Sequence, residues 1–282
     1  MKVLKKLSHY LTLVPLLILS LMFMLVPVMR LVEESFLDMG TGKFSLANWT
    51  AIFTETIYVK STTNSLKISL ISTVIGMLLS FLVAWAIREV SSKRANRFLG
   101  MVNMLSNFAG LPLAYAFMTI LGNAGFIVLL FKQFGVQLTG YFNLYGIEGL
   151  TLLAVYFQIP LGTLMLLPAF ESVRKEWKEA AELMNTTGIA FWWHIGLPAM
   201  IPSICDTFAL LFANALTAYA TFVLLVADNM PILPVKITYM FTGETQGQYN
   251  VGSALCVWMI LIMVIVITVC NLVKKYTYKG GM

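Results

Sequence analysis

Residues 171–202 read ESVRKEWKEAAELMNTTGIAFWWHIGLPAMIP, and this stretch decides how the rest of the chain is interpreted. Six charged residues fall within nine positions of it, between two long apolar stretches: Arg174, Lys175, Glu176, Lys178, Glu179 and Glu182. Large aromatic side chains accompany them, with more apolar area than a solvated loop exposes: Trp177, Phe191, Trp192 and Trp193. A membrane protein that holds such a segment between two spans presents it to something soluble.

The composition is that of a membrane protein. The chain is 59% hydrophobic and 11% charged, with a mean hydropathy of +0.83, whereas soluble domains contain about 25% charged residues. The alternation of a β-barrel is absent, so spanning helices remain as the physical option. The net charge of +6 is attributed to cytoplasmic Lys and Arg and not to nucleic-acid binding. All three cysteines lie in apolar runs and are expected to be buried thiols.

The apolar runs predict an all-α membrane fold with six transmembrane helices. A span needs roughly 20 apolar residues, and the candidates are Tyr10–Leu31, Ser65–Ile87, Phe98–Leu121, Leu150–Phe170, Met200–Ala227 and Val251–Val273. The apolar stretch Gly125–Phe134 is too short to span, which favours a re-entrant or interfacial helix. The first run also suits a signal peptide, but it is long and no small-residue cleavage site follows, so it is interpreted as a retained span.

The distribution of Lys and Arg predicts the orientation of the chain. With the N-terminus inside, thirteen basic residues lie on the inner side: Lys2, Lys5, Lys6, Arg88, Lys93, Arg94, Arg97, Arg174, Lys175, Lys178, Lys274, Lys275 and Lys279. Six lie on the outer side: Arg30, Lys43, Lys60, Lys67, Lys132 and Lys236. Both termini and the charged segment are therefore expected in the cytoplasm.

The charged segment is expected to form two short helices at an angle. Residues 171–184 read as a helix that continues out of the fourth span, residues 185–188 (Asn-Thr-Thr-Gly) break it, and residues 189–196 form a second short helix before the fifth span. Glu179 can pair with an Arg of a partner, and the Ala residues beside it permit close approach of another backbone. An amphipathic helix lying at the lipid interface is the alternative, with the Trp residues at headgroup depth.

The motifs of this segment resemble those of a known family. Glu-Ala-Ala at 179–181 is followed by Trp-x-x-Ile-x-Leu-Pro at 192–198 and by Pro202, and Ile-Pro stands at 159–160 in the fourth span. This pattern resembles the type I ABC-importer permeases, whose fold is called MetI-like. The resemblance implies a permease core over residues 65–282, with a cytoplasmic coupling loop at about 171–199. Residues 1–64 then hold the first span and a long external loop.

The resemblance assigns the coupling to a partner ATPase to nine residues: Glu179, Ala180, Ala181, Asn185, Gly188, Trp192, Ile195, Leu197 and Pro198. The family usually has Gly where this chain has Asn185. The turn there is expected to need a left-handed backbone, for which Asn is the next-best residue after Gly. Gly188 is expected to share that turn. His194 is interpreted as a packing or partner-contact residue.

The chain lacks motifs for chemistry of its own. The sequence shows no G-x-x-x-x-G-K-[ST] phosphate loop, no nucleophile–base pair and no cluster of metal ligands. We therefore predict no catalytic residues and no metal-binding residues in this chain. ATP and Mg²⁺ are therefore expected in a partner. The resemblance implies two ATPase subunits, a second permease that is a distinct homologue, an extracytoplasmic solute-binding protein and membrane lipid, in a bacterial inner membrane, with no nucleic acid.

A translocation pathway is predicted from polar residues within spans, which face a bundle interior or a cavity. Asn214, Thr217 and Thr221 are spaced i, i+3 and i+7 on the fifth span, and Gln158 lies on the fourth. Helix–helix hydrogen bonding is the alternative for each. Asp206 is interpreted as a helix cap.

The layout of the motifs leans toward the family branch that handles polyamines, ferric iron, 2-aminoethylphosphonate or thiamine, and the expected solute is a small polar molecule, a polyamine or related amine. An ion-coupled secondary transporter would need an ionisable residue or ion site at mid-depth, and none is visible. A membrane scaffold that recruits a soluble partner is the other alternative.

Overall fold

Helices long enough to cross a bilayer make up most of the chain. The computed structural model describes residues 14–38, 40–137, 140–226, 230–243 and 248–279. Within them, six helices have the length and composition of a membrane span: Val14–Ser35, Thr56–Glu89, Leu111–Gln133, Ile147–Ser172, Gly188–Leu216 and Tyr249–Thr277. The expected all-α membrane fold is confirmed. Residues 10–13 of the first expected span lie outside the described residues, as do Lys2, Lys5 and Lys6.

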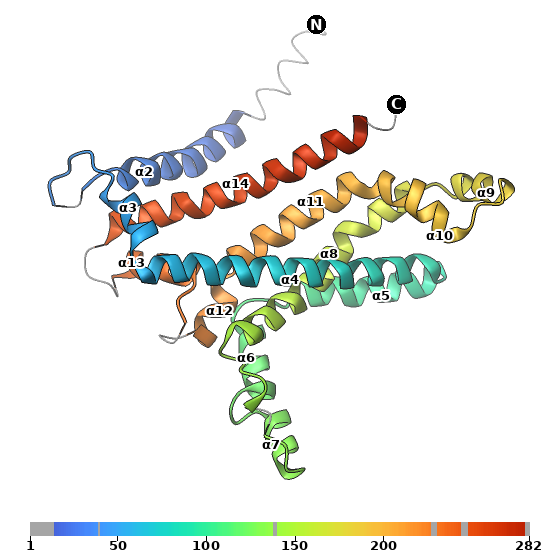
Figure 1. Cartoon of the computed structure of the whole chain (residues 1–282), viewed down its shortest axis with the longest axis horizontal. Coiled ribbons are helices and arrows are strands. Elements are labelled where there is room, and N and C mark those ends of the chain that lie inside the picture. The colour runs from blue at the N-terminus through green and yellow to red at the C-terminus, as the bar shows by residue number, and fades with distance from the viewer. Residues whose placement is uncertain (1–13, 39, 138–139, 227–229, 244–247, 280–282) are drawn as a thin grey trace, which may run out of the picture. The chain divides into compact units, whose positions relative to one another are not determined.

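The helical segments run in chain order as shown in Figure 1: η1 (Leu21–Leu25), α2 (Val26–Ser35), α3 (Ala47–Thr54), α4 (Thr56–Glu89), α5 (Ser92–Ser106), α6 (Leu111–Leu121), α7 (Phe126–Gln133), α8 (Ile147–Ser172), α9 (Lys175–Leu183), α10 (Gly188–Phe191), η3 (Trp192–Gly196), α11 (Leu197–Leu216), α12 (Tyr219–Val226), α13 (Leu233–Thr242) and α14 (Tyr249–Lys279). The segments η1 and η3 are π-helical. Contacts group the chain into two compact units, Met1–Val59 with Lys236–Leu261, and Lys60–Val235 with Ile262–Met282.

In the first unit, amide side chains hold the segment that follows α2. The Nδ2 of Asn48, on α3, donates to the carbonyl oxygens of Ser35 at 3.1 Å and Leu37 at 2.9 Å. The Nδ2 of Asn250, at the start of α14, donates to the same Leu37 carbonyl at 2.6 Å. These bonds satisfy carbonyls that the end of α2 leaves without a partner within the helix. The first part of the long loop is therefore fixed by contacts of its own.

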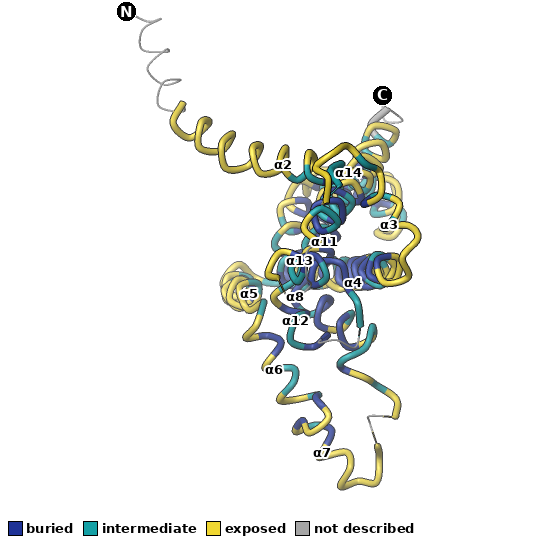
Figure 2. The backbone as a smooth tube through the Cα atoms, turned by 90° about the vertical axis from the view of Figure 1, so that its left-hand side faces the viewer, coloured by how far each residue is buried: buried dark blue, intermediate teal, exposed yellow. Residues whose placement is uncertain are grey.

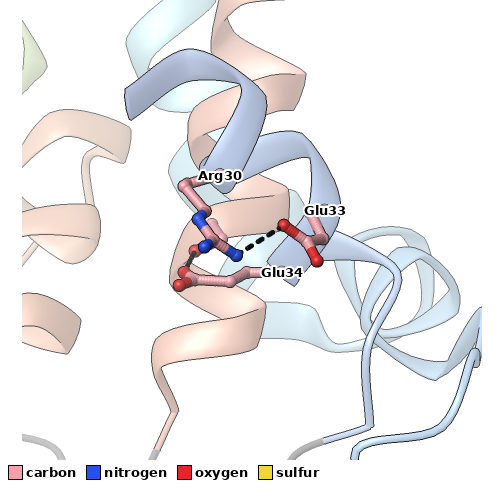
Figure 3. A network of polar contacts seen from close by, with 4 residues as sticks. Arg30, Glu33 and Glu34 are labelled. Atoms are coloured by element: carbon pink, nitrogen blue, oxygen red, sulfur yellow. Dashed lines mark hydrogen bonds and ion pairs between the residues drawn. The ribbon is translucent and has the colours of Figure 1, made fainter. Parts of the chain in front are cut away.

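A second polar contact joins α2 to α14 within this unit. The hydroxyl of Ser253 donates to the carboxylate of Glu34 at 3.0 Å. One turn away, Arg30 donates to Glu33 at 2.8 Å in an exposed ion pair (Figure 3). Figure 2 shows α2 exposed over most of its length, and Ser35 is its only buried residue among those described. An exposed apolar helix of this kind suits a lipid environment.

In the second unit, α4 and α8 approach each other closely at small residues. A Cβ on Gly76 would lie 2.6 Å from the Oε1 of Gln158, and a Cβ on Gly162 would lie 2.4 Å from the Oγ of Ser80. Gly76 and Ser80 are one turn apart on α4, and Gln158 and Gly162 are one turn apart on α8. Small residues at such spacing let helix backbones approach in a membrane. Helix α8 therefore packs directly against α4 over this turn.

The expected third span, Phe98–Leu121, is wrong, because the chain breaks within it. Helix α5 ends at Ser106, and α6 begins at Leu111 after Gly110, whose φ is +72°. A left-handed backbone costs little for Gly. The N–H of Gly110 donates to the hydroxyl of Thr221, on α12, at 3.0 Å. The stretch Gly125–Phe134 contains the short helix α7, and the third candidate span includes both α6 and α7.

The expected fifth span, Met200–Ala227, is also wrong at both ends. The helix begins at Gly188 and continues through α10, η3 and α11 to Leu216. It stops at Thr217, whose hydroxyl donates to the Ala213 carbonyl at 2.8 Å, and α12 then begins at Tyr219. A Thr hydroxyl that bonds to the preceding turn competes with the backbone and can bend or end a helix. Ala227 lies outside the described residues.

Candidate functional site

Helices α8 and α9 are separated by two extended residues. Helix α8 ends at Ser172, Val173 and Arg174 have ψ values of 101° and 144°, and α9 begins at Lys175. The expected continuous helix over residues 171–184 is therefore wrong at this point. The side chain of Val173 is buried in the core of the unit, and this burial turns the chain before α9 begins.

The turn after α9 has the left-handed backbone that the sequence predicted. The φ of Asn185 is +58°. The N–H of Thr186 donates to the Ala181 carbonyl at 2.9 Å, and the N–H of Asn185 donates to the Glu182 carbonyl at 3.0 Å. This pair of bonds is a Schellman motif, in which the residue after the helix cap is left-handed. The turn satisfies carbonyls that the end of α9 would otherwise leave unpaired.

Gly188 does not share that turn, contrary to expectation. Its φ is not positive, and it is the first residue of α10. The residue before it, Thr187, caps α10, because its hydroxyl accepts a hydrogen bond from the N–H of Ala190 at 3.3 Å. A Ser or Thr at this position typically stabilises a helix start. Asn185 therefore supplies the left-handed residue alone.

The inner face of the α9–α10 hairpin, residues 175–191, packs on the chain's own core. Ala181 and Phe191 are 1% and 2% exposed, and they share one buried cluster with Phe170. Trp192 and Ile195 are partly buried against the same cluster. The cluster also contains Ala84 of α4, so these contacts hold the base of the hairpin on α4, α8 and α11.

The expected docking residues therefore divide into two groups. Glu179 and Ala180 are exposed on α9 and accessible to a partner. Ala181 is buried within the chain, so the expectation that it lies against a partner is wrong. Leu197 and Pro198 form the first turn of α11 and are partly buried. The periodicity of α9 explains the difference, because neighbouring residues of a helix point to different faces.

The outer end of the hairpin carries an apolar tip, made of Leu183, Met184 and Ile189. Their exposed fractions are 90%, 70% and 85%. Large apolar side chains gathered in this way mark an interaction surface. A cleft of about 560 Å³ adjoins the hairpin. Charged residues of both signs line it, among them Arg88, Glu89, Lys175, Lys178, Glu179 and Glu182.

Gln158 lies at the junction of three helices. It is fully buried on α8, and its Nε2 is 3.2 Å from the Oγ of Ser72 on α4 and 3.4 Å from the carbonyl oxygen of Leu211 on α11. Its Oε1 has no hydrogen-bond partner and packs against Gly76. These contacts match helix–helix hydrogen bonding, the alternative to a pathway role.

The three polar residues expected on one face of the fifth span have different surroundings. Asn214 is partly buried on α11, whereas Thr217 is exposed at the end of that helix. Thr221 is buried on α12, where its hydroxyl accepts the N–H of Gly110. The helical spacing that placed them on one face is interrupted between Leu216 and Tyr219. The prediction of a continuous stripe is therefore wrong, and Asn214 keeps a pathway position as a prediction.

No family model matches the chain, but curated relatives share most of its length. It is 23% identical over 242 residues to the probable sulfate transport system permease protein cysT of Helicosporidium sp. subsp. Simulium jonesii, which covers 82% of this chain and 83% of the relative. It is 25% identical over 291 residues to the polygalacturonan/rhamnogalacturonan transport system permease protein YteP of Bacillus subtilis (strain 168), covering 96% and 89% of the two chains.

Solved structures share the fold. A chain of a bacterial ABC transporter involved in the import of the acidic polysaccharide alginate superimposes with a TM-score of 0.77 at 17% identity, over 98% of this chain and 99% of that one. The same kind of transporter in complex with an alginate pentasaccharide-bound periplasmic protein gives a TM-score of 0.76 at 17% identity, over 96% and 94%. The chain is thus similar to ABC-transporter permeases in sequence and to an ABC importer chain in fold. The resemblance identified from residues 159–202 is confirmed.

Two contacts of this permease were not anticipated from its sequence. Asp206 was expected to cap a helix, but it lies within α11 and forms an ion pair with Lys274 of α14. Arg88, counted only as an inner positive charge, contacts both ends of the hairpin segment through Val173 and Trp192. A basic residue near the end of a long apolar helix was the available signal in each case, but sequence spacing did not identify the partners.

Proposed function

We propose that this permease couples solute import to ATP hydrolysis in a separate ATPase subunit, and that the α9–α10 hairpin is the coupling element. The observation that carries the proposal is the division of the hairpin into a buried base and the exposed apolar tip. Burial of apolar surface is favourable by roughly 25 cal/mol per Å², so a partner that covers the tip is favoured. A base fixed in the core transmits a push on the tip to α8 and α11.

Charge and size complete the proposed interface. Glu179 is exposed on α9, near the tip, and pairs with an Arg of the ATPase. Ala180 is exposed and small, which lets a partner backbone approach it. Two ATPase subunits, which hold ATP and Mg²⁺, bind this chain and a second permease that is a distinct homologue. ATP binding draws the ATPases together, moves the hairpins and turns the solute cavity outward.

The orientation in this proposal has the hairpin and both termini in the cytoplasm of a bacterial cell. The excess of Lys and Arg on the side of the termini and the hairpin, thirteen against six on the opposite side, supports this orientation. The periplasmic protein bound to the alginate transporter supports an extracytoplasmic solute-binding partner for this permease. A reporter fused to the C-terminus that is active only outside the cytoplasm tests the orientation. We expect no activity from it, and activity would overturn the proposed orientation.

The proposed solute is a small polar molecule. The sequence leaned toward a polyamine within a branch that also handles thiamine, whereas the relatives are named for sulfate, for thiamine and for polygalacturonan or rhamnogalacturonan. Nothing in these relatives favours the polyamine over an anion or a sugar. Calorimetry of the solute-binding protein encoded beside this permease, with spermidine, sulfate and oligogalacturonate in parallel, separates the three. Binding of sulfate or oligogalacturonate without spermidine would remove the polyamine proposal.

Co-purification tests the coupling proposal. We expect the neighbouring ATPase to co-purify with the tagged permease in detergent, and Ile189→Asp to reduce the amount recovered at least tenfold, because it would bury a charge in an apolar interface. Phe134→Asp is the matched control, since Phe134 is 77% exposed outside the hairpin. An ion-coupled transporter or a scaffold would show no ATPase stimulated by solute and its binding protein. Equal recovery with both variants would exclude the hairpin as the docking site.

A further inference from the structure

Arg88, in the last turn of α4, makes two contacts that no motif in the sequence identifies. Its Nη2 donates to the carbonyl oxygen of Val173 at 3.1 Å. Its Cζ lies 5.5 Å from the centre of the Trp192 ring, over the face of the indole. The first contact is a charge-assisted hydrogen bond and the second is a cation–π contact. We name the two contacts together the Arg88 bridge.

The two ends of this bridge lie just before and just after the hairpin. Val173 is the cap residue at the end of α8, where the carbonyl oxygens carry the negative end of the helix dipole. Trp192 begins η3, directly after α10. One guanidinium therefore holds the chain where it enters the hairpin and where it leaves it, 19 positions apart in sequence. It joins both points to α4.

The surroundings fix the indole of Trp192 in the position that Arg88 contacts. Its ring lies 5.9 Å from the Phe170 ring and 5.8 Å from the Phe191 ring, edge to face with both. A Cβ on Gly196 would lie 2.4 Å from the indole Cε3. The absence of a side chain at Gly196 therefore leaves room for the ring. The wider π-helical turn of η3 separates Trp192 from Leu197, whose N–H donates to the Trp192 carbonyl.

We infer that Arg88 is a positioning residue for coupling, which makes the end of α4 and the hairpin move as one body. This inference rests on the proposed function of the hairpin. Without Arg88, the hairpin keeps its buried base, in which Ala84 of α4 shares one apolar cluster with residues of α8 and α11, but it loses its hydrogen bond and cation–π contact to α4. The end of α4 is then joined to the hairpin by apolar packing alone, so it follows a push on the apolar tip less closely. Docking of the ATPase does not need Arg88, because the tip lies apart from the bridge.

Spin labels measure the connection directly. The nitroxide labels are attached at two exposed positions, Glu89→Cys at the end of α4 and Glu176→Cys in the first turn of α9. The three native cysteines are replaced by Ala so that only these positions are labelled: Cys205, Cys256 and Cys270. In liposomes, we expect the permease to give one narrow distance peak, and Arg88→Ala to lose it. Arg88→Lys keeps a donor for the Val173 carbonyl but loses the planar stacking on Trp192. We expect its distance distribution to be wider than that of the permease with Arg88 and narrower than that of Arg88→Ala. Arg97→Ala, an exposed Arg of α5, is the control and keeps the narrow peak.

The assembled complex, with Mg-ATP as the probe, tests the role in coupling. We expect the narrow peak of the unsubstituted permease to persist with Mg-ATP, and the Arg88→Ala distribution to broaden further. ATPase recovery is expected to remain within about twofold of normal, which separates the bridge from docking. A narrow peak for folded Arg88→Ala, with and without Mg-ATP, would overturn the inference even if its melting temperature fell. Failure of the ATPase to bind any variant would contradict the proposed function, while the liposome measurement would still decide the bridge.

Discussion

The N–H of Thr186 donates to the carbonyl oxygen of Ala181 at 2.9 Å, and this bond closes the turn between α9 and α10. It fixes Asn185 in the left-handed region, with φ +58°. The same Ala181 buries its side chain in the core of the permease. The residue that anchors the hairpin thus also accepts the bond that shapes its turn.

Substitutions of Asn185 test this turn. Asn185→Gly is expected to change the stability of the permease by less than about 1 kcal/mol, because Gly adopts the left-handed backbone at least as easily. Asn185→Val is expected to cost about 1–2 kcal/mol, since a β-branched residue disfavours positive φ. Melting temperatures in detergent and ATPase recovery give the comparison. Equal melting temperatures for both variants would contradict the requirement for a left-handed residue.

Two glycines of the same segment give opposite expectations. Gly196→Ala places a Cβ 2.4 Å from the Trp192 indole and is expected to destabilise the permease by about 1–3 kcal/mol through overpacking. Gly188→Ala meets nothing within 4 Å at a position without positive φ, and is expected to stabilise α10 by about 0.4–1 kcal/mol. Thermal unfolding monitored by Trp fluorescence measures both. The same sign for the two changes would contradict the packing described for Trp192.

Substitutions of two polar residues of the spans, Gln158 and Asn214, are expected to affect different properties: the first the stability of the permease, the second solute uptake. Gln158→Ala removes buried hydrogen bonds between α8, α4 and α11, and is expected to cost about 1–3 kcal/mol of stability. Asn214→Leu, at a partly buried position, is expected to impair uptake while leaving assembly intact. Paired measurements of melting temperature and uptake in cells separate the two effects. Normal uptake with Asn214→Leu would remove Asn214 from the pathway.

The charge of Glu179 is expected to matter for the partner and not for the fold. Glu179→Lys sets a cation against the proposed Arg of the ATPase, and loss of a desolvated charge pair typically costs about 2–5 kcal/mol. Transport or ATPase association is expected to be abolished, with an unchanged melting temperature. Glu171→Lys, exposed near the end of α8, is the control for a charge reversal outside α9. Normal association with Glu179→Lys would contradict the proposed contact.

The sequence predicted features that depend on local chemistry. Long apolar runs predicted the spanning helices, because a bilayer leaves few other structures for an apolar chain. The departure from Gly at Asn185 correctly predicted a left-handed turn, since Asn tolerates that conformation. Motifs at 159–202 identified the family although identity to the relatives is only 23–25%.

Features that depend on distant partners were not predictable. The break at Gly110 accompanies a bond to Thr221, 111 positions away, and this bond also removes Thr221 from the expected stripe. Ala181 was assigned to the partner because a motif does not show which side of a helix faces the core. Arg88 was treated as a free positive charge, and its contacts to Val173 and Trp192 become visible only when three helix ends meet.

Crosslinking from the apolar tip tests the central claim most directly. A photoreactive amino acid replaces Ile189, which is 85% exposed, and in a second variant it replaces Phe134 as the control. After irradiation of membranes that contain the permease and the neighbouring ATPase, mass spectrometry identifies the joined peptides. We predict that Ile189 crosslinks to the ATPase subunit and that Phe134 does not. Crosslinks from Ile189 to lipid alone, with an active transporter, would contradict the assignment of the hairpin as the coupling element.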